Sequence, residues 1–202
     1  VAEAEAASAS AAIKLLLNNR IVLTLGIVSF CATFGESIAI TWSVLHLRDL
    51  GASAFIGGAG FALFNTVMFV GRMTNNNVVV RFGVVTSFLI SAVAITVAGL
   101  LIFLTSNLWV AIAAFALLGL GVAGGVPTAL TAGAQYVPGQ NSTLSGALMS
   151  INYLSFIICP PLIGNLATMT SRQSALLVTV VVGIAMMIMT RRLAAYQATP
   201  PR

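Results

Sequence analysis

The sequence predicts an all-α integral membrane protein, a bundle of six transmembrane helices. Hydrophobic residues make up 59% of its 202 residues and charged residues only 6%, whereas soluble domains carry roughly 25% charged residues. A soluble fold of this length would lack the polar groups to cover its surface, but a bilayer accepts an apolar surface. The few charges lie at the ends of long apolar runs, as in membrane-spanning helices.

Six apolar segments are long enough to cross a membrane, because about 20 helical residues span the hydrocarbon core. We expect spans at about 21–45, 54–71, 84–104, 108–133, 144–167 and 174–190. They form one transmembrane domain, 19–192, between a polar linker, 1–18, and a short tail, 193–202. The runs are too long and too uniformly apolar for the strands of a membrane barrel, which are about 10 residues long.

Short connections with turn residues separate the spans. They are Arg48–Gly51, Thr74–Asn77, Thr105–Asn107, Pro138–Asn141 and Thr170–Arg172. Such short links force neighbouring spans to run in opposite directions.

The basic residues predict the orientation. With the N-terminus inside, seven of the nine lie at inside ends, and the other two, Arg48 and Arg172, lie outside. The seven are Lys14, Arg20, Arg72, Arg81, Arg191, Arg192 and Arg202. The positive-inside rule then places both termini in the cytoplasm. We expect a multi-pass protein of the inner (cytoplasmic) membrane.

Glu36 is the only acidic residue within an apolar run. It follows Arg20 by 16 residues, about 24 Å at helical rise, which predicts a position in the outer half of the membrane. Ser29, Thr33 and Ser43 share its helix face. Two interpretations stand: Glu36 contacts substrate or a coupled proton, or it bonds to a neighbouring helix or reaches the outer surface.

The fifth span repeats this pattern. Asn152 and Ser155 share a polar face with Ser145 and Cys159, and Tyr153 adjoins it. Pro160 and Pro161 then break or kink the helix. The face is either a cavity wall with a hinge or a set of interhelical hydrogen bonds with a structural kink. Asn65, alone in the second span, fits cavity lining and helix packing equally well.

Small residues mark the fourth span. Gly121 and Gly125 form a GxxxG pair, and Pro127 follows. The pair indicates close helix packing, or else a helix that flexes during a conformational change.

Enzyme signals are absent from the sequence. The single histidine, His46, cannot form a His-based metal site or triad within the chain, and no nucleotide-binding or hydrolase motif occurs. We expect no cofactor and no metal. Trp42, near the outer end of the first span, is either an interface anchor, which is the favoured interpretation, or a platform on which substrate stacks.

Several stretches are similar to a known family. They are Phe34–Glu36 with Trp42–Ser43, Leu47–Asp49, Gly71-Arg72 through Arg81–Gly83, Leu117–Gly121 with Val126-Pro127, and Pro160–Gly164. In this order they resemble the C-terminal half of a major facilitator superfamily transporter, from a bacterial branch of sugar permeases and efflux proteins. The resemblance implies half of a twelve-helix fold, with 1–18 as the end of the cytoplasmic linker between halves.

The resemblance places Arg72 through Gly83 in a cytoplasmic loop whose motif contributes to gating. Here the chain departs from the family: the Asp of the motif is Val80, and the basic residues after Gly83 are Val84 and Val85. Only Arg81 and Gly83 carry over, which puts this gating contact in doubt.

The function implied is transport of a small solute by alternating access, as a symporter or antiporter. The partner would be the N-terminal half or a second copy of the chain. Because no basic residue lies within a predicted span, we expect a cation for Glu36 to come from the other half, the solute or a proton. The alternative is a membrane-embedded interaction or scaffold protein, or a degenerate transporter half.

Overall fold

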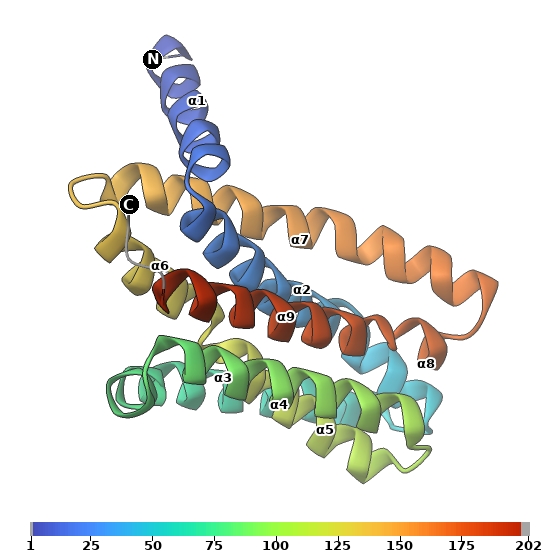
Figure 1. Ribbon diagram of the computed structural model, residues 1–202. Coiled ribbons are helices and arrows are strands. Elements are labelled where there is room, and N and C mark those ends of the chain that lie inside the picture. The colour runs from blue at the N-terminus through green and yellow to red at the C-terminus, as the bar shows by residue number, and fades with distance from the viewer. Residues whose placement is uncertain (1, 199–202) are drawn as a thin grey trace.

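The computed structural model describes residues 2–198, which form helices and no strand (Figure 1). Six helical stretches are long and apolar enough to cross a membrane. These are α2 (Arg20–Asp49), α3 (Ala54–Phe82), α4 (Val84–Leu104), α5 (Leu108–Ala123) with α6 (Gly125–Tyr136), α7 (Asn141–Met169), and α8 (Arg172–Ala175) with α9 (Val178–Ala198). The predicted all-α membrane fold with six spans is confirmed.

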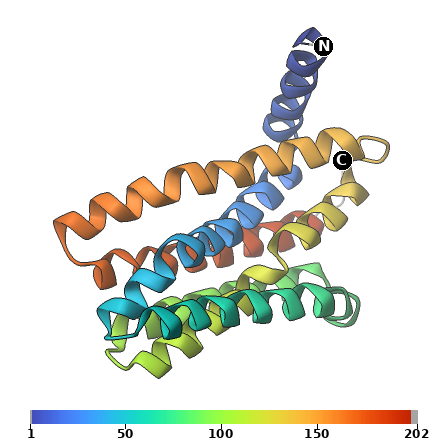
Figure 2. The ribbon, with the colours of Figure 1, turned by 180° about the vertical axis from the view of Figure 1, so that it is seen from behind.

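The six stretches run antiparallel to their sequence neighbours (Figures 1 and 2). Helix α2 begins at Arg20 and ends at Asp49, and the two ends of the bundle are named after these residues. The Arg20 end carries the α3–α4 and α6–α7 connections and the last turns of α9. The Asp49 end carries the α2–α3, α4–α5 and α7–α8 connections.

Helix α2 is the most buried of the six spans, and α5 with α6 is the next. Helix α2 packs extensively on α7 and α9, and α5 packs in the same way on α3 and α4. Helices α4 and α9 pack on each other. Exchanging the first span with the fourth, the second with the fifth and the third with the sixth leaves this pattern of contacts unchanged. Two inverted three-helix repeats are expected to have this symmetry.

Helix α3 is longer than the sequence indicated. It continues through Thr74–Asn77, where we predicted a turn, and ends only at Phe82. The Thr74 hydroxyl donates to the Val70 carbonyl, and the Asn75 amide donates to Thr128 of α6, so these polar groups are satisfied within a helix. The turn is made by Gly83, whose φ of 82° suits glycine. The prediction of a turn at 74–77 was wrong.

The fourth span is interrupted between α5 and α6. Pro127 has no N–H to donate to the carbonyl of Ala123, four residues earlier, and α5 ends at Ala123. Helix α6 begins at Gly125, after the single non-helical residue Gly124.

Helix α7 continues without interruption through Pro160 and Pro161. A break is therefore absent, although the prolines deprive the carbonyls of Phe156 and Ile157 of their usual helical donors.

The predicted small-residue contacts are made. A Cβ on Gly121 would lie 2.9 Å from Cγ1 of Ile95 in α4, and a Cβ on Gly125 would collide with Ala32 of α2. The span therefore packs closely on α4 and α2 through these glycines.

Helix α1 (Ala2–Asn18) covers most of the segment expected to be a linker, and it projects from the Arg20 end of the bundle (Figure 1). Asn19 separates it from α2, and the Asn19 side chain accepts hydrogen bonds from the backbone amides of Ile21 and Val22. Arg202, counted above among the inside basic residues, lies outside the described residues.

Candidate functional site

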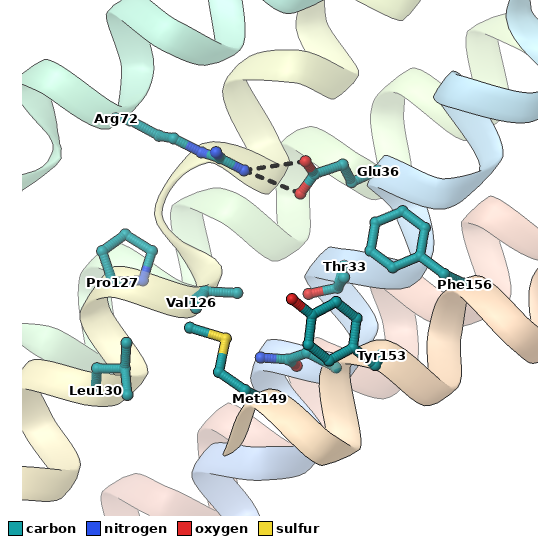
Figure 3. Close-up of a pocket in the computed structure, with 10 residues that line it drawn as sticks. Thr33, Glu36, Arg72, Val126, Pro127, Leu130, Met149, Tyr153 and Phe156 are labelled. Atoms are coloured by element: carbon teal, nitrogen blue, oxygen red, sulfur yellow. Dashed lines mark hydrogen bonds and ion pairs between the residues drawn. The ribbon is translucent and has the colours of Figure 1, made fainter. Parts of the chain in front are cut away.

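A cavity of about 500 Å³ lies between α2, α3, α6 and α7 (Figure 3). Its polar and charged lining comes from Thr33, Glu36, Arg72, Asn152 and Tyr153. The rest of its wall is apolar and consists of Val126, Pro127, Leu130, Met149 and Phe156. A mostly apolar pocket with a few convergent polar groups is typical of a small-molecule site.

Glu36 and Arg72 point toward each other across this cavity (Figure 3). The Nη2 atom of Arg72 donates to both carboxylate oxygens of Glu36, at 3.1 and 3.0 Å. The Glu36 side chain is 14% exposed and the Arg72 side chain 44%. The expectation that the cation for Glu36 comes from outside these six spans was wrong, because Arg72 supplies it.

The cause of this error is the length of α3. We placed Arg72 in a loop, but it lies within the helix, ten residues before its end at Phe82. Ten residues correspond to about 15 Å of helix. Glu36 is likewise the seventeenth of the 30 residues of α2, near the middle of that helix rather than toward its Asp49 end. The two charges therefore meet deep in the bundle.

Asn152 joins α7 to α2 at the base of the cavity. The Ser29 hydroxyl lies 3.0 Å from Oδ1 of Asn152, and both residues are buried. The Nδ2 atom of Asn152 is buried and has no partner among the described residues. Burying an amide without a hydrogen bond costs free energy, so a polar group that reached this donor from the cavity would gain a hydrogen bond.

The other predicted site residues divide into two groups. Thr33 is buried, lines the cavity and donates to the Ser29 carbonyl, and Tyr153 lines it with 66% of its surface exposed. Ser155 is buried and bonds to the backbone of its own helix, and the Asn65 amide does the same. Neither Ser155 nor Asn65 is among the cavity-lining residues.

A smaller cavity, of about 110 Å³, continues from Arg72 toward the Arg20 end. Asn75, Asn76, Thr128 and Thr131 give it a polar lining. Arg72 and Pro127 line both cavities. The sequence Asn75–Asn77 has the composition of a turn, but two of these asparagines line this cavity, and three consecutive polar residues beside an apolar run were the signal that could have indicated it.

The remaining family-like loop residues lie at the end of α3. The Arg81 guanidinium lies over the Phe82 ring at 5.3 Å, and Gly83 makes the turn. Among the described residues no group of three or more His, Cys, Asp or Glu side chains could hold a metal ion.

The sequence matches the family model of the Major Facilitator Superfamily over residues 25–202. The chain belongs to this superfamily. Its six helices correspond to one six-helix half of the major facilitator fold, as the resemblance implied.

Three relatives are transporters or membrane proteins by name. The chain is 30% identical to an uncharacterized transporter, y4wD, of Sinorhizobium fredii over 78% of its length, and to the membrane protein MosC of Rhizobium meliloti over 83%. It is also 30% identical to an uncharacterized MFS-type transporter of Yersinia pestis over 76%. The chain spans only 40–42% of the length of these relatives.

Proposed function

We propose that this chain is one six-helix half of a secondary transporter that moves a small solute across the cytoplasmic membrane by alternating access. Superfamily membership supports transport in general. The observation that carries the proposal is the cavity at the middle of the bundle. Its otherwise apolar wall holds an ion pair and Asn152, whose amide nitrogen has no partner among the described residues.

The cavity is one wall of a binding site and needs a second wall. Four of the six spans line it, and Tyr153 and Arg72 are both substantially exposed there. In the membrane such polar groups need protein or water rather than lipid opposite them. The other six-helix half, or a second copy of this chain, would provide that surface and enclose the solute.

The Glu36–Arg72 pair gives the cavity a means of coupling. An isolated carboxylate at this depth is costly, by about 2.5–3.5 kcal/mol on insertion scales, so Glu36 needs a partner throughout the cycle. Arg72 provides it here. If the pair opens, a solute group or a proton must replace Arg72, which links the conformational change to binding.

The interrupted fourth span would supply the flexibility for such a change. With Gly124 between α5 and α6, and no N–H on Pro127 to donate to the Ala123 carbonyl, the junction lacks one helical hydrogen bond. Val126, Pro127 and Leu130, just beyond the interruption, line the cavity. Bending at this point would therefore alter the site directly.

The basic residues support an orientation with the Arg20 end in the cytoplasm. With Arg72 within the bundle, the described basic residues at that end are Lys14, Arg20, Arg81, Arg191 and Arg192, against Arg48 and Arg172 at the Asp49 end. The excess favours the cytoplasm for both chain ends.

Access to the cavity tests this proposal without knowledge of the solute. Cysteine is introduced into the native protein at Tyr153 in the cavity, at Ala54 by the Asp49 end, or at Gln140 by the Arg20 end. Cys31 and Cys159 are buried and should not react. A membrane-impermeant maleimide is then applied from either side of the membrane.

Alternating access predicts that Tyr153→Cys reacts from both sides. Ala54→Cys should react only from outside and Gln140→Cys only from the cytoplasm. A scaffold or degenerate half has no cycle, so Tyr153→Cys would react from one side at most, and that result would overturn the proposal. Exchange of the sides for the two end positions would overturn the orientation alone.

A further inference from the structure

A second cavity, of about 550 Å³, lies at the Asp49 end of the bundle between α2, α7 and α8. Trp42 and Asp49 of α2, Arg172 of α8, and Pro161, Gly164, Asn165, Ala167 and Thr168 of α7 line it. None of these described residues lines the cavity around Glu36. On α2, Trp42 and Asp49 stand roughly 120° and 140° around the helix from Glu36, at about 100° per residue. The two cavities therefore use different faces of α2.

This cavity is polar at its rim and apolar below. Asp49 is the last residue of α2 and Arg172 the first of α8, so both charges lie where the helices end. Trp42 lies seven residues before Asp49, about 10 Å deeper along the helix. A tryptophan at this depth, beside charges at the helix ends, is typical of the boundary between lipid headgroups and hydrocarbon.

Asp49 and Arg172, at the rim of the cavity, form an ion pair but keep the capacity for further hydrogen bonds. Nη1 of Arg172 bonds to the Asp49 carboxylate and donates to the Leu45 carbonyl at 3.1 Å. Nε of Arg172 has no partner among the described residues, and neither does Nε1 of Trp42. The Asp49 side chain is 51% exposed, which leaves its carboxylate open to a further donor. The rim therefore offers one cationic and one anionic group at close range.

An exposed apolar strip continues from the cavity along α7. Leu154, Ile157 and Ile158 are 47%, 68% and 44% exposed. They precede Pro161 by seven, four and three residues, so they share its side of the helix. Where this strip faces the hydrocarbon of the bilayer, an acyl chain can pack along it.

We propose that this cavity binds a zwitterionic phospholipid with a primary ammonium group, of the phosphatidylethanolamine type. Its phosphate accepts hydrogen bonds from Arg172, and its ammonium donates to Asp49. Its glycerol region lies against Trp42 and Gly164, and one acyl chain follows Leu154, Ile157 and Ile158. A net anionic headgroup matches only half of the Asp49–Arg172 pair, and a quaternary ammonium cannot donate a hydrogen bond to Asp49.

Native mass spectrometry of the native protein tests the site with three probes. Dioleoyl phosphatidylethanolamine, phosphatidylcholine and phosphatidylglycerol are added in equal amounts, and the retained lipid adducts are compared. We expect the wild type to retain phosphatidylethanolamine most strongly. Arg172→Gln should lower that adduct by about tenfold, as expected for losing one charge-assisted hydrogen bond. Asp49→Asn should remove the preference over phosphatidylglycerol.

Gly164→Leu tests the contribution of the cavity without removing either charge of the Asp49–Arg172 ion pair. The atoms nearest to a Cβ on Gly164 belong to the Trp42 ring, at 3.7 Å, so a leucine side chain enters the space beside Trp42 while both charged residues are kept. This variant should lose the phosphatidylethanolamine adduct. The matched control, Arg48→Gln, removes an exposed arginine that does not line the cavity and should leave the adduct unchanged. Equal retention of the three lipids by the wild type, or an undiminished adduct in Gly164→Leu, would overturn the proposal.

Discussion

Removal of Arg72 should destabilise the bundle through Glu36. Arg72→Met keeps much of the aliphatic side chain but leaves the Glu36 carboxylate, 14% exposed, without its partner. Breaking a buried ion pair by removing one partner costs about 3–5 kcal/mol, whereas exposed pairs contribute about 0.2–1 kcal/mol. Because Arg72 is 44% exposed, we expect an intermediate loss, about 2 kcal/mol.

Thermal unfolding of the purified protein measures this loss. A change of about 2 kcal/mol corresponds to a fall in Tm of roughly 4–8 °C for a domain of this size. The deciding measurement is a double-mutant cycle. In a Glu36→Gln background no carboxylate is left unpaired, so Arg72→Met should cost less than about 0.5 kcal/mol.

The matched control for this cycle is Arg81→Met, on the same helix. Arg81 is exposed and lies over the neighbouring Phe82 ring, so its removal should change stability by less than about 0.5 kcal/mol. Equal losses for Arg72→Met in the wild-type and Glu36→Gln backgrounds would show that the pair contributes no coupling energy, and the reasoning from burial would fail.

Three further predictions concern the cavity and the packing around it. In the native protein, Glu36→Gln should make the labelling of Tyr153→Cys favour one side of the membrane, because the neutral glutamine amide cannot exchange an ion pair with Arg72 for a bound proton. Unchanged labelling from both sides would leave Glu36 a structural residue. Gly119→Ala should destabilise the protein by about 1–3 kcal/mol, because its Cβ would lie 2.5 Å from a backbone oxygen of α3. Gly146→Ala, with nothing within 4 Å, serves as the control, and equal thermal shifts would contradict the packing argument. Pro127→Ala restores a backbone donor to the interrupted span, so it should preserve or raise the Tm while slowing the exchange of Tyr153→Cys between the two sides; faster exchange would count against bending at this point.

The sequence was sufficient for the fold because the hydrophobic runs are long and the membrane permits few alternatives. It was also sufficient to place Glu36, Ser29 and Asn152 on inward faces, since an apolar surround makes any polar residue conspicuous. Ser29 and Asn152 do meet. Their contact joins residues 123 positions apart, and only the packing of α2 on α7 brings them together.

The sequence misled where a polar run lies within a helix. Thr74–Asn77 has the composition of a turn, but Thr74 bonds to its own helix and Asn75 to α6. These contacts remove the advantage of leaving the helix. Because the predicted span ended at residue 71, Arg72 fell outside it and was not recognised as the partner of Glu36. The apolar cavity residues, such as Met149 and Phe156, could not be recognised, because in a membrane protein an apolar side chain does not distinguish a cavity wall from lipid contact.

The single-residue turn at Gly83 limits how this protein can change in length. Helices α3 and α4 are joined by Gly83 alone, so the turn leaves no slack to absorb an inserted residue. Each residue added to or deleted from the stretch between Arg72 and Gly83 would rotate Arg72 by about 100° relative to α4 and move it along the helix by about 1.5 Å. Such a change would carry the guanidinium away from Glu36 even though neither charged residue is altered. Insertions and deletions should therefore be selected against in this stretch. They should be tolerated at the longer α6–α7 connection, where a change in length need not rotate a helix about its axis.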